Sequence, residues 1–424
     1  MKNIIKKIKS SDFITVFFFD MIVKFFTVII SILIIRCLTK TDYAVYTLFN
    51  SIGSFISGVL GSGVGLAYTR YAVQLRQQKN GEENNLYCVL RKWMILIGGV
   101  IVIGGSCILA FIDKHEFNII AGLMYGVLLA NYQLNTVFFQ AKEKYSIGGA
   151  VSNIKNIIVA VVIFGVFALQ RKMQVDYLLI IYLLAMICSW MITVVYINRN
   201  FLAKENHEMI INKKSNILRL MLKESIWIIL YMFMISAFNQ IDVLILNYKC
   251  QQIDVATYGV AFKYYSLILS LLPSLQVVLR VRNSRAEMLE SEELRRISVM
   301  NWIKKSTPIA VGLFVLGIFF ARVLFPILNG NDYNDSIEIF NILLIGACLS
   351  YITAPNVSVM LAAGKQKILF ILSVGAFLIN LIGNWMFIPL YGGIAAAITT
   401  VIAHFFLNGG STVILLKSKQ REKC

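Results

Sequence analysis

The stretch WMILIGGVIVIGGSCILAFI, residues Trp93–Ile112, contains no charged side chain and determines how the rest of the chain is interpreted. About 20 apolar residues in a helix, at ~1.5 Å per residue, cross the ~30 Å hydrocarbon layer of a membrane. Eleven further stretches of similar length and composition occur along the chain, separated by charged segments. The sequence therefore predicts an all-α polytopic membrane protein with about 12 transmembrane helices.

The twelve predicted spans fall into two sets of six. The first set comprises Phe13–Ile35, Tyr43–Tyr68, Trp93–Ile112, Ile119–Phe139, Ser146–Leu169 and Tyr177–Ile197. The second set comprises Ile226–Tyr248, Tyr258–Leu279, Ser306–Leu328, Ile337–Leu361, Ile368–Pro389 and Gly392–Leu416. We expect an N-terminal six-helix lobe over residues 1–197, a cytoplasmic linker over residues 198–225 and a C-terminal six-helix lobe over residues 226–424.

Composition and charge distribution exclude a soluble fold and predict the orientation of the chain. The chain is 58% hydrophobic and 15% charged, which is too apolar for a water-soluble domain of this length. If both termini face the cytoplasm, most of the 40 Lys and Arg residues lie in cytoplasmic segments, as the positive-inside rule requires. The net charge of +18 then reports topology and contacts with anionic lipids, and we expect no nucleic-acid partner.

The second half of the chain repeats the layout of the first. After a shift of half the chain length, Asp42–Tyr46 (DYAVY) aligns without a gap with Asp254–Tyr258 (DVATY). Each copy lies where the chain returns into the membrane, and each precedes one span and a long basic loop. Because six spans per half give both halves the same orientation, the sequence predicts a parallel repeat, an arrangement found in alternating-access transporters.

Charged and polar side chains inside the first span are candidate site residues. Asp20, Lys24, Thr27 and Ser31 recur at helical spacing and share one face of the predicted helix. Charges in hydrocarbon cost several kcal/mol unless they pair or face water, so they often mark functional interiors. We expect this face to line a water-filled cavity; an ion pair in which Asp20 and Lys24 only neutralise each other is the alternative.

The second half carries a corresponding set of polar groups. Asn239 and Asp242 precede an outward loop, Lys263 follows it, and Arg322 lies at similar depth. Since Asp242 and Lys263 have matching depths on adjacent antiparallel helices, we expect them to form an ion pair.

Several further side chains have two plausible roles. Arg70 and Arg280 mark inward ends of spans, as snorkelling anchors or as contacts to a phosphate, and the role of Lys155 stays open in the same way. The glycines of Gly61–Gly65 predict close helix packing, and four asparagines predict hydrogen bonds between helices, namely Asn131, Asn135, Asn380 and Asn384. Scattered cysteines and isolated histidines predict no metal or cofactor site.

Three stretches of the second half resemble segments of the polysaccharide-biosynthesis flippases. Phe325–Ser336 is similar to the outward turn after their ninth helix, Leu361–Lys367 to their helix 10–11 turn, and Asn384–Gly393 to their signature before helix 12. Asp42–Tyr46 and Asp254–Tyr258 occupy the place of an acidic-x-Gly-x-Tyr element. Ala44 and Ala256 stand where glycine is usual in that element.

The resemblance implies a Wzx-type flippase with a MATE-like fold, in the multidrug/oligosaccharidyl-lipid/polysaccharide exporter superfamily. Such proteins are not enzymes; they move undecaprenyl-pyrophosphate-linked oligosaccharide repeat units to the outer leaflet of the bacterial cytoplasmic (inner) membrane, for O-antigen or capsule synthesis. The implied partners are this substrate, membrane lipids and polysaccharide polymerase machinery. Family members often have a cationic central cavity, in which Lys24 and Lys263 have matching places, although the second span contains no buried cation.

Two other functional classes stay open at this point. A MATE-like drug/cation antiporter shares the fold but should place acidic groups in its cavity, whereas the intramembrane excess of cations in this chain favours an anionic cargo. A membrane polysaccharide polymerase or ligase needs a sizeable outward loop with acid–base or Arg clusters. The predicted outward loops are short, about ten residues at most.

Overall fold

The structure, a computed structural model, is helical over most of the residues that it describes. These residues are 24–77, 82–111, 117–169, 173–202, 211–270 and 292–417, with the single positions 22 and 272. No strand occurs within these ranges. Hydrocarbon offers no partner to backbone N–H and C=O groups, so apolar spans satisfy them inside helices. The predicted all-α fold class is confirmed.

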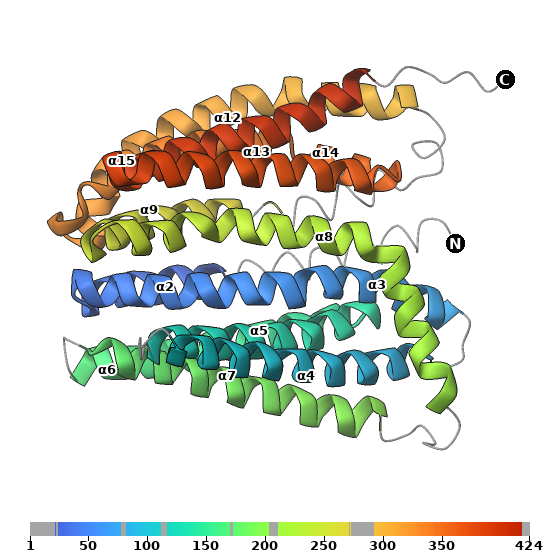
Figure 1. The fold of residues 1–424 in the computed structure, drawn as a ribbon. Helices are drawn as coiled ribbons and strands as arrows, with labels where there is room; N and C mark the ends of the chain where they lie inside the picture. Colours follow the sequence, from blue (N-terminus) through green and yellow to red (C-terminus); the bar gives the residue numbers. More distant parts are fainter. Residues whose placement is uncertain are drawn as a thin grey trace. The chain divides into compact units, whose positions relative to one another are not determined.

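The first half of the chain forms a series of long helices (Figure 1). Residues 24–37 are the described part of the first predicted span. The elements that follow are α2 (Lys40–Ser57), η1 (Gly58–Ser62), α3 (Gly63–Gln77), α4 (Glu82–Phe111), α5 (Phe117–Ala141), α6 (Tyr145–Leu169), α7 (Val175–Ile197) and η2 (Asn198–Leu202). The π-helical turn η1 joins α2 to α3 without a break, and together they contain the predicted span Tyr43–Tyr68.

The second half continues with further helices. They are α8 (Ile211–Lys249), α9 (Gln252–Leu269), α12 (Glu292–Asn329), η3 (Asn331–Tyr333), α13 (Ser336–Ile352), α14 (Pro355–Ala362) and α15 (Gln366–Lys417). Gly392 interrupts α15 with non-helical angles, φ 55° and ψ −134°. Glycine adopts a positive φ without steric cost, and Pro389 lacks a backbone N–H, so the sequence ends one helix here and begins another.

The number of spans agrees with the prediction once the merged and partly described helices are considered. Eight described helices are long and apolar enough to cross a membrane, or nine if the bent pair α13–α14 is one span. The 52-residue α15 contains two predicted spans. Phe13–Ile35 and Tyr258–Leu279 extend beyond the described residues. Each of the twelve predicted spans therefore coincides, in whole or in part, with helix.

The chain divides into two compact units. Unit 1 comprises Met1–Leu38 and Val45–Ser236, and unit 2 comprises Thr39–Ala44 and Ala237–Cys424. In unit 1, α5 packs against α3, α4, α6 and α7; in unit 2, α13 packs against α9, α12 and α15. The lobes and the cytoplasmic linker over residues 198–225 stay a prediction. The described parts of that linker, residues 198–202 and 211–225, are helical, because a helix rich in Leu, Lys and Ile need not end where the hydrocarbon ends.

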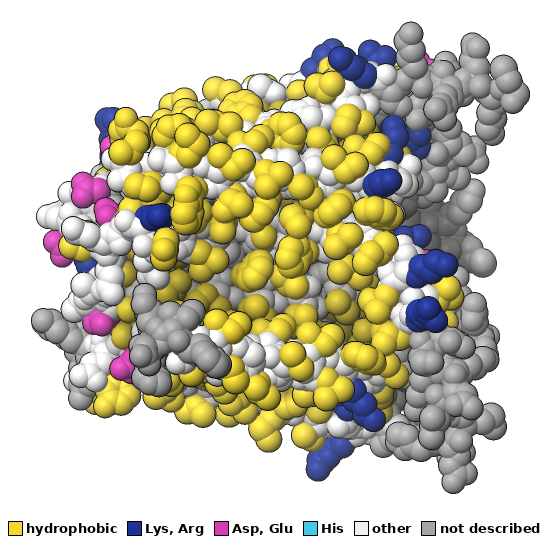
Figure 2. Space-filling view, in the orientation of Figure 1, with side chains coloured by type: hydrophobic (Ala, Val, Ile, Leu, Met, Phe, Trp, Pro, Cys, Tyr) yellow, Lys and Arg dark blue, Asp and Glu magenta, His cyan; other side chains and the backbone are white. Residues whose placement is uncertain are grey.

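Within each unit the exposed middle of the helices is hydrophobic (Figure 2). Lys and Arg side chains gather mainly near one end of the helices, and most Asp and Glu side chains near the other. An apolar segment of 18 residues in α4 and another in α12 are each only 11% buried. Apolar helix faces of this extent are stable in contact with lipid and not with water, so the protein is a multi-pass membrane protein.

Candidate functional site

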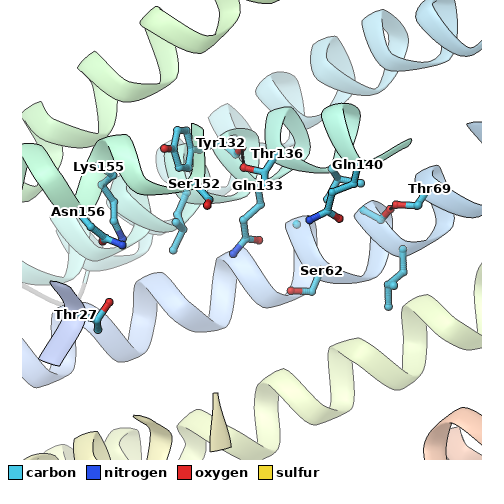
Figure 3. Close-up of a pocket in the computed structure, with 15 residues that line it drawn as sticks. Thr27, Ser62, Thr69, Tyr132, Gln133, Thr136, Gln140, Ser152, Lys155 and Asn156 are labelled. Atoms are coloured by element: carbon cyan, nitrogen blue, oxygen red, sulfur yellow. Dashed lines mark hydrogen bonds between the residues drawn. The ribbon is translucent and has the colours of Figure 1, made fainter. Parts of the chain in front are cut away.

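A polar pocket of about 460 Å³ lies inside unit 1 (Figure 3). Residue 27, η1, α3, α5 and α6 provide its walls. Its polar side chains are Thr27, Ser62, Thr69, Tyr132, Gln133, Thr136, Gln140, Ser152, Lys155 and Asn156. Of the described residues that line the pocket, Lys155 is the only charged one. Unit 1 thus carries an open pocket, in which polar side chains and a single cation of the described lining lie among apolar residues.

The π-helical turn η1 shapes one wall of this pocket. A π turn is rare and often occurs at functional sites. A Cβ added to Gly61 would collide with Oε1 of Gln133 and lie 3.2 Å from Cα of Ala130, so glycine permits the close approach of α5. A Cβ at Gly58 would likewise collide with Oγ of Ser236 on α8. The predicted packing role of this glycine-rich segment is confirmed.

Helix α6 presents three polar residues of the pocket on one face. Ser152, Lys155 and Asn156 have i, i+3 and i+4 spacing, which places them side by side. The Lys155 ammonium donates a hydrogen bond to Tyr125 OH at 3.2 Å and lies 5.8 Å from the centroid of that ring. Tyr132 OH donates to the backbone carbonyl of Val151, which links α5 to α6. These contacts position the cation at the pocket wall.

Amide side chains make up much of the remaining polar surface of the pocket. Gln133, Gln140 and Asn156 have no side-chain hydrogen bond within the described part of the chain, and neither has the Ser62 hydroxyl. Each amide offers two N–H donors and a carbonyl acceptor. The pocket can therefore bind a ligand whose groups both donate and accept hydrogen bonds.

Unit 2 contains a second polar cluster, which is closed. Asp242 of α8 is 1% exposed. Its Oδ2 accepts hydrogen bonds from Tyr258 OH at 2.5 Å and Thr400 Oγ1 at 2.6 Å, and its Oδ1 accepts one from Asn384 Nδ2 at 2.6 Å. Asn384 also donates to Asn380, which donates to Thr400. The cluster joins α8, α9 and α15 through a carboxylate whose two oxygens are both bound.

The expected ion pair between Asp242 and Lys263 is wrong. The hydrogen-bond partners of the carboxylate are Tyr258, Asn384 and Thr400. Tyr258 and Lys263 are five residues apart on α9, which separates them by about 140° around a helix of ~3.6 residues per turn. Because Tyr258 faces Asp242, Lys263 faces another direction. Matching depth in the membrane does not require that two side chains face each other.

The first predicted span contributes one side chain to the pocket. Thr27 lines it. Ser31 is buried and donates a hydrogen bond to the backbone carbonyl of Thr27 at 2.6 Å, so its hydroxyl serves the helix itself. Lys24 is half-buried. Asp20 lies outside the described residues, as does Arg280.

The other predicted site residues are not brought to either cluster. Asn239 is half-buried on α8. Arg70 is exposed on α3, and Arg322 is exposed on α12 beside exposed Phe319 and Val323. A cavity shared by these residues with Lys24 and Lys263 stays a prediction.

Some polar groups inside the spans were interpreted correctly. Asn135 Nδ2 donates to Thr193 Oγ1 at 2.7 Å, and Tyr87 OH donates to Asn135 Oδ1 at 2.7 Å, so Asn135 connects α4, α5 and α7. Asn380 and Asn384 bond between helices as expected. Asn131, by contrast, donates to Val127 of its own helix. Gln133 and Asn156 line the pocket and are not among the predicted site residues, although the sequence places the amide of Asn156 directly after Lys155.

Comparisons with known proteins agree with this architecture. The sequence profile of a family described as polysaccharide biosynthesis protein matches residues 11–279. A comparison with curated proteins found no match.

Among solved structures, the chain is similar to the lipid II flippase MurJ in an inward closed conformation, with 18% identity, 96% of this chain and 87% of that chain covered, and a TM-score of 0.70. It is also similar to an inward-facing multidrug resistance MATE transporter of the MOP superfamily, with 13% identity, 96% and 99% covered, and a TM-score of 0.70. A Vibrio cholerae MATE transporter matches with 15% identity, 97% and 98% covered, and a TM-score of 0.65. The predicted MATE-like fold is confirmed.

Proposed function

The chain belongs to the polysaccharide biosynthesis protein family, and on that premise we propose that it flips undecaprenyl-pyrophosphate-linked oligosaccharide repeat units across the bacterial cytoplasmic (inner) membrane. The repeat units move from the inner to the outer leaflet by alternating access, and they serve the synthesis of O-antigen or capsule. Both termini face the cytoplasm. The polysaccharide polymerase machinery receives the product.

The polar pocket of unit 1 is the observation that carries this proposal. A pyrophosphate and its sugars cannot cross hydrocarbon unaided, because each unsatisfied polar group costs several kcal/mol there. Lys155, the amides and the hydroxyls of the pocket replace water around such a head group. The exposed apolar faces of the helices leave the polyprenyl chain in lipid.

Other cations of the chain act on the phosphates in this proposal. Lys24 and Lys263 neutralise charge inside the membrane, and Arg70 and Arg280 capture the head group at the inward end of the path. Interactions between an ammonium or guanidinium and phosphate are charge-assisted and stronger than neutral hydrogen bonds. A set of separate cations along the path allows the pyrophosphate to move stepwise.

Two alternatives remain, and the residues of the pocket favour neither. A drug/cation antiporter needs a carboxylate in contact with its cargo, whereas the described lining carries one lysine and no acidic residue. The carboxylate of Asp242 is buried and bound to three donors. A polymerase or ligase needs an outward acid–base site in addition to a membrane path.

A vesicle assay separates the three functions. Purified protein is reconstituted with fluorescent lipid-linked oligosaccharide, and a membrane-impermeant quencher is added outside. A flippase makes the inner-leaflet probe accessible to the quencher and leaves its mass unchanged. A polymerase or ligase changes the mass of the glycan. Probe that stays protected in vesicles with active ethidium efflux would contradict the proposal and support the antiporter.

A further inference from the structure

The unit 1 pocket contains more hydrogen-bonding groups than the described chain uses. Gln133 reaches from α5 towards the helix that carries Ser62, while Asn156 and Lys155 approach from α6 on the side of Thr27 (Figure 3). The amides of Gln133 and Asn156 are without a side-chain hydrogen bond among the described residues. Buried polar groups in native proteins generally have partners, so this pocket is built to receive a polar ligand.

The kinds of groups in the pocket indicate which part of the cargo fits. An ionised pyrophosphate only accepts hydrogen bonds, and it is bound best by several cations in concert. The described lining of the pocket offers one cation, Lys155. A sugar hydroxyl both donates and accepts, and so does a side-chain amide. Paired amides and hydroxyls therefore match a neutral sugar far better than they match a phosphate.

We propose that the unit 1 pocket is a sugar subsite, which binds one uncharged, hydroxyl-bearing ring of the cargo while the pyrophosphate is held elsewhere. This inference rests on the proposed function. From the neighbouring helices α5 and α6, Gln133 donates to ring hydroxyls and Asn156 both donates to them and accepts from them. The Lys155 ammonium donates to a ring or hydroxyl oxygen. The volume of about 460 Å³ suits a group of monosaccharide size and lies at the lower end of the ~300–1,000 Å³ usual for small-molecule sites.

The amide of Gln133 lies against Gly61. Oε1 of Gln133 is buried against Gly61 without a hydrogen-bond partner among the described residues, at the point where any larger side chain would collide with it. The carbonyl end of the amide is thus fixed at the wall, and the amino end faces the cavity as a donor (Figure 3). This arrangement gives Gln133 one orientation and leaves Asn156 to supply both kinds of hydrogen bond.

The test compares two probes on purified protein. One probe is undecaprenyl pyrophosphate without sugar, and the other is the undecaprenyl-pyrophosphate-linked oligosaccharide extracted from cells whose surface polysaccharide depends on this chain. Dissociation constants are measured for the wild type, for the double variant Gln133→Leu/Asn156→Leu and for the control Asn118→Leu. Asn118 also carries its amide on α5 but lies outside the pocket.

We expect the sugar-bearing probe to bind the wild type more tightly than the sugar-free probe. The affinity of the double variant for the sugar-bearing probe should be about tenfold lower than that of the wild type, which corresponds to ~1.4 kcal/mol of binding free energy. It should bind the sugar-free probe as the wild type does, and Asn118→Leu should change neither value. If the double variant does not elute as a folded protein, Gln140→Leu replaces it, because that side chain is exposed.

Three other results would overturn parts of this account. If the double variant binds both probes more weakly by the same factor, the pocket is a phosphate site. If it binds both probes as the wild type does, the pocket binds neither the sugar nor the phosphate. Either result leaves the proposed flippase function intact. If the wild type binds neither probe, that result would instead contradict the proposed function itself.

Discussion

The unit 1 pocket and the Asp242 cluster of unit 2 differ in how their polar groups are paired. In unit 1, amides and hydroxyls line a cavity and several have no partner within the described chain, with Lys155 at the wall. In unit 2, Asp242 sits in a closed cluster, and Tyr258, Asn384 and Thr400 bind both of its oxygens. A polar residue in a span is therefore not in itself a sign of a transport path, because its partners decide its role.

The physical reason lies in the cost of burial. Moving a polar group out of water costs free energy unless the group forms a hydrogen bond. A network in which every group is hydrogen-bonded offsets that cost and fixes the packing around it. The cluster around Asp242 is such a network. An open pocket repays the cost only when water or a ligand enters, so its groups remain available for binding.

The repeated DYAVY and DVATY segments make the same point at corresponding positions. Tyr46 and Tyr258 end these segments, and both are buried. Tyr46 OH shares a hydrogen bond of 2.9 Å with Tyr182 OH in unit 1, whereas Tyr258 OH donates to a carboxylate in unit 2. The two halves thus repeat the position of the tyrosine and differ in the chemistry of its partner.

The largest expected effect is the loss of the Asp242 carboxylate. Asp242→Ala leaves three buried donors unpaired, and each costs ~1–3 kcal/mol, so several kcal/mol of stability should disappear. Thermal unfolding in detergent measures this as a large fall in Tm. Asp332→Ala is the control, because Asp332 is exposed in the same unit and should change Tm little.

A charge exchange sharpens the same prediction. Asp242→Lys/Lys263→Asp should not restore stability, because the contacts of the carboxylate are hydroxyls and an amide. Recovery of Tm in the exchanged variant would show that Asp242 and Lys263 form an ion pair. It would also contradict the contrast between the unit 1 pocket and the closed cluster around Asp242.

The second expected effect concerns a closed polar contact in unit 1. Lys142 Nζ lies 2.8 Å from Glu83 Oε1, and the two side chains are only 16% and 11% exposed. Breaking a fully buried pair costs ~3–5 kcal/mol, and partial exposure reduces the expected cost of Lys142→Met to about 2–3 kcal/mol. Tm measurements should show this loss.

The neighbouring pair of Arg76 and Glu143 provides the control. Its side chains are 42% and 63% exposed and 3.7 Å apart, so Arg76→Met should cost less than about 1 kcal/mol. Equal losses in both variants would mean that burial does not distinguish closed contacts from open ones in unit 1.

Lys155 should affect transport more than stability. Lys155→Met removes a cation that can bind cargo oxygens, and charge-assisted hydrogen bonds contribute ~1.5–3 kcal/mol, so flipping should slow by about tenfold or more. Membrane abundance and Tm should stay near wild type, because the hydrogen bond and the ring contact of Lys155 are both made with one residue, Tyr125. Lys155→Arg should retain part of the rate. A large loss of abundance in Lys155→Met would instead make the residue structural.

The fold is predictable from the sequence, because the positions of the helices depend on the length of apolar stretches and on local signals such as Pro389 and Gly392. Interhelical bonds of Asn135, Asn380 and Asn384 were also predictable, because buried amides in spans need partners. The candidate site is harder to predict from the sequence. Periodicity shows that Asp242 and Lys263 lie within spans, but only tertiary packing turns Tyr258 and not Lys263 towards the carboxylate.

The most direct test of the contrast is the reactivity of single cysteines, in a background from which the seven native cysteines have been removed. Ser62→Cys places a thiol in the unit 1 pocket, and Ala397→Cys places one in the closed packing of α15. We expect a small hydrophilic thiosulfonate to modify Ser62→Cys quickly and Ala397→Cys very slowly, and lipid-linked oligosaccharide to protect only the first. Equal reactivity at the two positions, or no protection of Ser62→Cys, would contradict the account.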